Sequence, residues 1–371
     1  MISKQKSILS SLDWGLIIFP TILCLIGLLV LYSAGYNPET SESQAFKLQG
    51  IYFGISFFVF IFTAFLNPKF LKRISPLVYF IGIGLLLFLL IKGGIMAGGA
   101  RRWLSLGPVR MQPSEVMKIG AIMMLARVFA SDSAPKDGYN LKNLLYPALI
   151  MFVPAALIMK QPDLGTALCL LAIGATMIFV AGLRFSSIFK ILVTLILLAV
   201  PVYEFGLKEY QKQRVITFLS PEKDPLGRGY HSLQSKIAVG SGAVFGKGFR
   251  KGTQTQLRFL PEQTTDFVFS VLAEEWGFLG SLTVIGIYCL LIMQLLNLAS
   301  KMQDPFSMYL TIGTAALIFW HTFINIGMVI GILPVVGITL AILSYGGSSL
   351  LTTMCLLGMV AGLSARRYMF S

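Results

Sequence analysis

The stretch WGLIIFPTILCLIGLLVLYS, residues 14–33, decides the fold class. It contains no Asp, Glu, Lys or Arg, and a run of about 20 apolar residues is long enough to cross the hydrocarbon core of a bilayer as a helix. Similar runs recur along the 371 residues, which are 56% hydrophobic and only 12% charged. Because a soluble protein is roughly 25% charged, this sequence predicts an all-α polytopic membrane protein.

Ten such runs predict ten transmembrane helices in a single transmembrane domain, residues 1–371. The helices are expected at about 14–34, 47–66, 74–93, 114–131, 143–160, 165–183, 186–205, 267–299, 306–330 and 338–365. Lys and Arg gather in the short segments on the side of the N-terminus, and such residues mark the cytoplasmic side. Both termini are therefore expected to be cytoplasmic, with the large loop 206–266 between the seventh and eighth helices on the outer face.

Two segments expected on the outer side are unusually basic. One is GGARRWLSLGPVRMQPSE, residues 98–115, and the other is the loop 206–266, with ten Lys and Arg against five Asp and Glu. A cationic surface beside the bilayer suits an anionic ligand such as a lipid phosphate. Adjacent Arg101 and Arg102 can chelate phosphate oxygens, and Trp103 suits the membrane interface or the face of a sugar. The alternative is that these three residues are interfacial anchors.

Two further motifs place polar residues where helices are expected to begin. In QPSEVMK, residues 112–118, Glu115 and Lys118 are three apart on one helical face and can form an ion pair. Because an ion pair near lipid is costly, a functional role is favoured over a structural one. In QPDLGTAL, residues 161–168, Asp163 either caps the next helix or orients an arginine.

The stretch FLPEQTTDFVFSVLAEEWG, residues 259–277, brings carboxylates to the mouth of the eighth helix. Asp266, just before the apolar run, is either a helix cap or a general base. Glu274 and Glu275 lie about two turns deeper, and carboxylates inside a membrane are costly enough to count as site candidates. An acidic point with basic surroundings fits a general base beside a bound pyrophosphate.

Other patterns exclude particular chemistries. The glycine run GSGAVFGKG, residues 240–248, lacks the spacing of a nucleotide phosphate loop, because Gly248 rather than Ser or Thr follows Lys247. The four cysteines form no CxxC pair, so the sequence indicates neither a zinc site nor a disulfide framework. Two histidines in the whole chain do not make a metal site.

Three more patterns predict local structure. Residues 230–239 are expected to form a short amphipathic helix whose apolar face includes Leu233. The paired glycines of SYGGSSL, residues 344–350, are expected to allow close helix packing within the tenth span. His321 and Asn325, four residues apart in the ninth span, are expected to make a polar contact across the bundle.

These motifs, in this order, resemble the SEDS family (shape, elongation, division and sporulation) along nearly the whole chain. The similar stretches are GARRW, QPSE, QPDLGTAL, FLPE followed by TDF, and SYGGSS. LPVVGI, residues 333–338, is similar to the elongation-type branch of the family. The resemblance implies a ten-helix fold. The chain departs from the family at Thr264, where His is usual, and at Ala341, where Pro is frequent, so a histidine role at the first position cannot apply.

The resemblance implies a peptidoglycan glycosyltransferase that polymerises lipid II on the outer face of the bacterial inner membrane. The essential aspartate of the family falls on Asp266, and the QPSE motif with its lysine falls on Glu115 and Lys118. The implied partners are a class B penicillin-binding protein, which is a transpeptidase, and other membrane proteins of the elongation complex. No nucleic acid partner is expected.

Glycan polymerisation joins a sugar hydroxyl to the anomeric carbon of a lipid-pyrophosphate sugar by one inverting displacement. Asp266 is the candidate base for the hydroxyl proton, and the leaving pyrophosphate needs cations. The candidate pyrophosphate contacts, chosen by charge and position, are Arg101, Arg102, Arg214, Lys247 and Arg258. Alternatively, Asp266 holds a divalent cation, Mg or Mn, on the pyrophosphate. The residues do not choose between these roles.

Two rival functions belong to other classes. A lipid-linked sugar transporter, or flippase, also needs polytopic helices with charges, but it should place ligand groups near the midplane and at both faces. The unusual residues of this chain concentrate on the expected outer side, which favours chemistry there. A scaffold that only docks a transpeptidase would leave Asp266 and the pair of Glu115 and Lys118 without a task.

Overall fold

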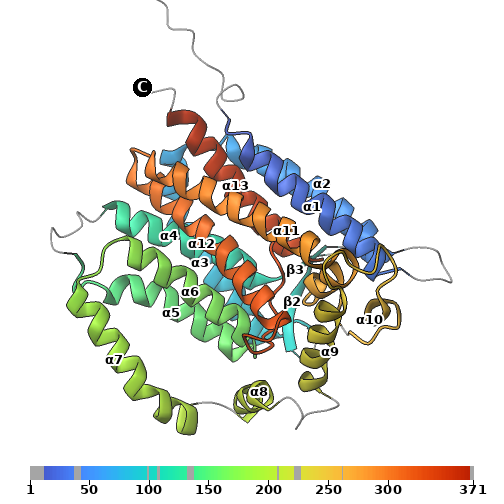
Figure 1. Ribbon diagram of the computed structural model, residues 1–371. Helices are drawn as coiled ribbons and strands as arrows, with labels where there is room; N and C mark the ends of the chain where they lie inside the picture. Colours follow the sequence, from blue (N-terminus) through green and yellow to red (C-terminus); the bar gives the residue numbers. More distant parts are fainter. Residues whose placement is uncertain are drawn as a thin grey trace, which may run out of the picture.

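The computed structural model is a helical bundle in which every expected apolar run contains a helix (Figure 1). It describes residues 12–36, 43–97, 100–106, 109–131, 138–206, 209–220, 227–260 and 262–367. The ten long helices are α1 (Gly15–Ala34), α2 (Gln44–Ala64), α3 (Pro68–Lys92), α4 (Pro113–Ser131), α5 (Leu145–Lys160), α6 (Leu164–Val180), α7 (Phe185–Pro201), α11 (Val268–Ser300), α12 (Pro305–Val329) and α13 (Gly347–Arg367). Among the described residues, α1, α2, α3, α11, α12 and α13 are long and apolar enough to cross a membrane. The chain is therefore a multi-pass membrane protein, whereas ten crossings and the orientation remain predictions.

The centre of the bundle is formed by α4, α12 and α13, whose side chains are largely buried. Helix α13 packs along α2, α12 packs against α4, α6 and α11, and α3 packs along α4. In Figure 1, α12 and α13 accordingly lie between the pair α1 and α2 on one side and the group α4, α5 and α6 on the other. Side chains that face the outside of this bundle are apolar, as in Phe58, Phe80 and Phe179.

The structure contains a small sheet, which the sequence did not predict. Strands β1 (Ile95–Ala97), β2 (Ala100–Leu106) and β3 (Val109–Met111) form an antiparallel sheet in the order β1-β2-β3 between α3 and α4. The register pairs Ile95 with Trp103, and Leu104 with Met111. The basic ARRW motif is therefore held on a strand rather than in an open loop, which fixes where Arg102 and Trp103 point.

The tenth expected span, 338–365, is wrong at its start because α13 begins only at Gly347. The preceding backbone is not helical, with Gly337 at φ 76° and Ile342 at φ 72°. The expected close packing at the paired glycines is confirmed, since a Cβ atom at Gly347 would lie 2.6 Å from the ring of Tyr52.

The described part of the loop 206–266 contains short helices as well as irregular chain. The loop follows η2 (Val202–Gly206), and its helices are α8 (Glu209–Leu219), α9 (Arg228–Ser241) and α10 (Thr253–Gln256). The expected helix within 230–239 is confirmed, and Leu233 lies on an exposed side of it whereas Ser235 lies on the buried side. The Ser235 hydroxyl lies 2.8 Å from both Ser270 Oγ and the Val329 carbonyl, so α9 docks by polar contacts.

A break in α11 joins this loop to the bundle. Gly277 has φ 68° and ψ −162° inside the helix, a conformation that favours glycine. The backbone N–H groups of Lys247 and Gly248 donate to the carbonyls of Glu274 and Glu275, each at 3.0 Å. The loop thereby satisfies helix carbonyls beside the break.

The contact between α2 and α13 gives a first prediction. A Cβ atom at Gly362 would lie 2.0 Å from the Ala64 carbonyl oxygen, so Gly362→Ala must separate the two helices. We expect it to lower the free energy of unfolding by about 1–3 kcal/mol, as overpacking does. Thermal unfolding of the detergent-purified protein measures this. Gly54→Ala on α2 is the matched control, because no atom lies within 4 Å of the Cβ position; equal unfolding temperatures for the two variants would contradict the close contact.

Candidate functional site

A cavity of about 630 Å³ brings most of the expected site residues together. Its wall is formed by the sheet, the starts of α4 and α6, the end of the loop before α11, α12, and the chain between α12 and α13. The charged residues on its wall are Arg102, Glu115, Lys118, Asp163, Arg214, Glu262 and Asp266. The cavity also touches Trp103 and both histidines, so it gathers residues from almost the entire chain.

Asp266 lines this cavity instead of capping α11. The cap residue of α11 is Phe267, and no side chain accepts a hydrogen bond at this helix start. Asn325 Nδ2 donates to the Asp266 carbonyl at 2.8 Å, which fixes the backbone. Gly337 has φ 76°, a conformation that favours glycine, and a Cβ atom there would make a tight contact of 3.2 Å with Asp266 Oδ2. The capping interpretation is therefore wrong.

The surroundings of Asp266 favour its neutral form. Burial raises the pKa of Asp266 to about 6, and the negative charge of Glu262 acts in the same direction. A hydrogen bond from Thr265 and the charge of Arg102 oppose this rise without cancelling it. A carboxyl group whose pKa lies near neutrality is suited to accept and release a proton.

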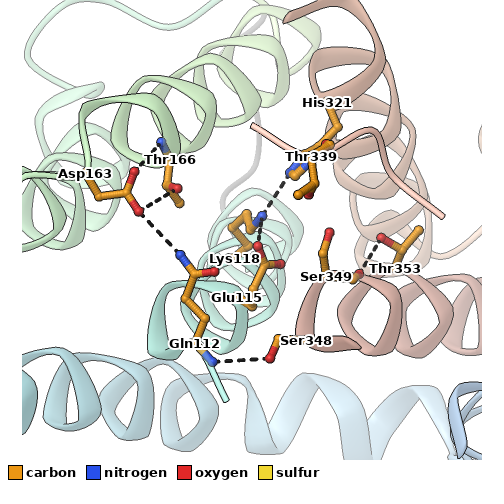
Figure 2. Close-up of polar contacts among 10 residues, drawn as sticks. All are labelled: Gln112, Glu115, Lys118, Asp163, Thr166, His321, Thr339, Ser348, Ser349 and Thr353. Atoms are coloured by element: carbon orange, nitrogen blue, oxygen red, sulfur yellow. Dashed lines mark hydrogen bonds and ion pairs between the residues drawn. The ribbon is translucent and has the colours of Figure 1, made fainter. Parts of the chain in front are cut away.

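Glu115 and Lys118 form the expected ion pair at the buried end of the cavity (Figure 2). Lys118 Nζ lies 2.7 Å from Glu115 Oε1, and the two side chains are 1% and 7% exposed. On the other side, Lys118 Nζ lies 2.9 Å from His321 Nε2 of α12. The polar contacts expected of His321 and Asn325 across the bundle are confirmed. His321 contacts Lys118, and Asn325 donates to the Ile338 carbonyl.

Asp163 performs both of the tasks between which the sequence left a choice. Its carboxylate caps α6 by accepting from the Thr166 N–H at 3.2 Å and from the Thr166 hydroxyl at 2.9 Å. It also lies 3.7 Å from Arg102 Nη1 and accepts from Gln112 Nε2 at 3.3 Å. Arg102 donates as well to the carbonyl of Pro162. Asp163 and Pro162, just before α6, therefore fix the orientation of the Arg102 side chain.

The structure brings one other expected cation, Arg214, to this cavity. Arg214 reaches the cavity wall from α8 and is 8% exposed. Arg101 lies on β2 opposite Met96, and its side chain falls outside the described part of the structure. Trp103, two residues along the strand, lines the cavity.

Lys247 and Arg258 are not brought to this cavity. Lys247 Nζ pairs with Glu274 Oε1 at 2.8 Å, and Arg258 is exposed after α10. Glu274 is fully buried, and its carboxylate also accepts from the N–H groups of Gln254 and Thr255. Neither Glu274 nor Glu275, the site candidates deep in α11, lines the cavity, and Glu275 instead accepts from the Ser33 hydroxyl. Glu274 anchors the glycine-rich loop to the helix.

The sequence missed the residues that complete the cavity by long-range contact. Gln112 and Thr166 surround Asp163, and Thr339 carries the carbonyl next to His321 Nδ1, at 3.0 Å (Figure 2). His321 was recognisable in the sequence as a polar residue within an apolar helix. Gln112 was recognisable as the first residue of the motif QPSE. Nothing in the sequence predicted the role of Thr339. Its carbonyl can bind His321 only because the chain is not helical there, and the sequence predicted a helix.

The described residues hold no group of three His, Cys, Asp or Glu side chains placed to bind a metal ion. Mg²⁺ is commonly held by one or two carboxylates with phosphate oxygens of a substrate. Asp266 would supply one such carboxylate if a divalent cation binds in this cavity.

With this geometry established, comparisons with known proteins define the family. The family model FtsW/RodA/SpoVE, described as cell cycle protein, matches residues 14–369. The chain belongs to this family. It is the SEDS family indicated by the motifs.

Relatives match the chain over nearly its full length. Peptidoglycan glycosyltransferase MrdB of Escherichia coli (strain K12) is 41% identical over 357 residues, which cover 95% of each chain. Peptidoglycan glycosyltransferase RodA of Treponema pallidum is 32% identical over 96% of this chain and 98% of its own. The crystal structure of the rod shape determining protein RodA from Thermus thermophilus is 29% identical, with a TM-score of 0.71 over 96% of this chain and 98% of that one.

A solved complex shares the fold more closely. One chain of a peptidoglycan synthase complex, studied for the coordination of polymerization and crosslinking, has a TM-score of 0.82 and 31% identity. The match covers 96% of this chain and 98% of that chain. The fold of this SEDS member is therefore shared with a protein that works in such a complex.

The anchoring role of Glu274 gives a second prediction. Glu274→Gln removes the charge that pairs with Lys247 and replaces one acceptor oxygen with an amide. We expect a loss of about 2 kcal/mol in the free energy of unfolding, because a buried group that loses its partner is strongly destabilised. Thermal unfolding and limited proteolysis of residues 246–258 measure the loss. Lys251→Gln, an exposed change in the same segment, is the control; identical protection from protease in both variants would contradict the role of Glu274.

Proposed function

We propose that this chain is a peptidoglycan glycosyltransferase that polymerises lipid II into glycan strands on the outer face of the bacterial cytoplasmic membrane. Relatives up to 41% identical over 95% of the chain are peptidoglycan glycosyltransferases. The observation that carries the proposal is the cavity in which Asp266 shares a wall with Arg102, Lys118 and Arg214. A base and several cations in one cavity suit a hydroxyl acceptor and a pyrophosphate leaving group.

In this reaction, Asp266 takes the proton of the attacking sugar hydroxyl. With a pKa of about 6, the carboxyl group is mostly ionised at neutral pH and is a stronger base than an ordinary aspartate. The hydroxyl oxygen then bonds to the anomeric carbon while the bond to the pyrophosphate oxygen breaks, which inverts the configuration. One carboxylate is enough, because no covalent glycosyl intermediate forms.

The cations stabilise the charge that develops on the leaving pyrophosphate. Arg102 is pre-oriented by Asp163, and Lys118 is fixed by Glu115, so neither side chain needs to be ordered during the reaction. Arg214 adds a third positive charge from the loop 206–266. The position of Asp266 also allows the alternative in which its carboxylate and the pyrophosphate share Mg²⁺ or Mn²⁺.

A class B penicillin-binding protein and the other membrane proteins of the elongation complex are the partners we propose. Support comes from the synthase complex, which coordinates polymerization and crosslinking and contains a chain with the same fold. A strand polymerised by this chain would be crosslinked by such a transpeptidase.

The direct test is polymer formation from purified lipid II by the wild-type chain, alone and with its transpeptidase, compared with Asp266→Asn. We expect the variant to lose at least about 100-fold in rate, because it keeps the shape of the base without its proton affinity. The matched control is Asp304→Asn, which makes the same change at the cap of α12, outside the cavity. Equal rates for Asp266→Asn and wild type would remove Asp266 from the chemistry, and a folded wild-type complex that makes no polymer would favour a transporter.

The raised pKa gives a prediction of pH dependence. Because the base must be ionised, the rate should rise with pH around a midpoint of about 6 and then reach a plateau. Stability should change in the opposite direction. Between the ordinary pKa of 3.8 and about 6, the native state holds a proton at Asp266 that the unfolded state has lost, so the free energy of unfolding falls as pH rises.

Asp266→Asn separates this group from the other titrating residues. The difference in unfolding temperature between wild type and Asp266→Asn should change between about pH 4 and 6 and stay constant above that range. Parallel stability curves throughout the range would show that the pKa of Asp266 is not raised.

A further inference from the structure

His321 is a buried histidine to which the proposed reaction assigns no role. It comes from α12, is 3% exposed, and lines the cavity beside Lys118. Its ring bridges two elements, with Nε2 2.9 Å from Lys118 Nζ and Nδ1 3.0 Å from the Thr339 carbonyl (Figure 2). Both polar nitrogens of this buried ring therefore have a partner, as burial requires.

The two contacts determine which nitrogen carries the proton. A carbonyl oxygen can only accept, so Nδ1 of His321 must carry the hydrogen that it shares with Thr339. In the neutral ring, Nε2 is then an acceptor, and the ammonium group of Lys118 can only donate to it. The Thr339 carbonyl thus sets the tautomer that lets His321 bind a lysine.

Glu115 and His321 together fix the direction of the ammonium group. Lys118 has three N–H bonds, of which one is directed to Glu115 Oε1 and one to His321 Nε2. Two fixed directions on a tetrahedral nitrogen also fix the third. Lys118 is itself part of the cavity wall, so the third N–H is the one left for a ligand.

Helix α12 connects this end of the cavity to the base. One turn beyond His321, Asn325 donates to the carbonyls of Asp266 and Ile338, at 2.8 and 2.7 Å. Ile338 precedes Thr339, the residue that binds His321. One face of α12 therefore binds residues 338–339, and through His321 and Asn325 it also contacts Lys118 and the backbone of Asp266.

We propose that His321 is a positioning residue that holds Lys118 with one N–H directed into the cavity, toward a phosphate oxygen of the lipid-linked donor. This rests on the proposed glycosyltransferase function. His321 does not touch the substrate; it acts through Lys118. The charge of the ammonium group would stabilise the developing negative charge on the leaving group, so the contact matters most in the transition state.

Steady-state kinetics with lipid II test this role in the chain complexed with its transpeptidase. In His321→Phe, Lys118 loses one acceptor, and we expect kcat to fall about 10-fold or more with KM nearly unchanged. His321→Gln offers an amide oxygen to Lys118 and should recover much of that loss. The matched control is Thr322→Val, the next residue of α12, which is buried and is not part of the cavity wall. Wild-type kcat in His321→Phe, or no recovery in His321→Gln, would overturn the proposal.

A second measurement is independent of activity. The chain has only two histidines, so ¹⁵N-histidine labelling gives two rings, and His231→Gln assigns them. We expect His321 to carry its proton on Nδ1 and the Nε2 resonance to shift in Lys118→Met. A proton on Nε2, or no shift in Lys118→Met, would overturn the proposal. If wild type makes no polymer, the proposed function fails and the role in catalysis fails with it, while this spectrum still reports whether His321 holds Lys118.

Discussion

Placing an ionised side chain within an apolar bundle costs several kcal/mol unless a counter-charge or hydrogen bonds compensate. The rest of the site depends on how this chain meets that constraint. Lys118 is enclosed by Glu115 and His321, and Asp163 is enclosed by Arg102, the start of α6 and Gln112. The charges of Lys118 and Asp163 are thereby fixed in direction as well as compensated. The same contacts that make burial tolerable give the cavity pre-oriented groups.

Glu274 and Asp266 show that the cost of burying a carboxylate can be met in two different ways. Glu274 receives backbone and side-chain donors from residues 253–255 and from Lys247, and it serves to hold a loop. Asp266 instead lies on a cavity wall, where burial and Glu262 raise its pKa to about 6. A carboxylate whose charge is fully satisfied contributes to stability. One whose charge is poorly satisfied is reactive, because its basicity is higher.

The sequence predicted features that depend on neighbours along the chain. Runs of apolar residues located the helices, and the spacing of three between Glu115 and Lys118 predicted their ion pair. It did not predict contacts between distant segments. Strand β2, ARRWLSL, does not strictly alternate polar and apolar residues, so no strand pattern marked the sheet that carries Arg102, and His321 meets Lys118 across 203 positions. Lys247 was chosen as a pyrophosphate contact by its charge and its position in the sequence, and neither reveals which carboxylate a lysine will meet.

The chain between α12 and α13 explains why hydropathy wrongly predicted that the last helix begins at residue 338. Residues 338–346 are as apolar as a helix interior, yet their backbone is not helical. The carbonyls of Ile338 and Thr339 bind Asn325 and His321, and the carbonyl of Ser344 accepts from Gln49 at 3.1 Å. A helix would occupy those carbonyls with its own N–H groups. Irregular backbone is tolerated at such depth only where protein or a cavity surrounds it. This segment therefore exchanges internal hydrogen bonds for the contacts that build the wall beside Asp266.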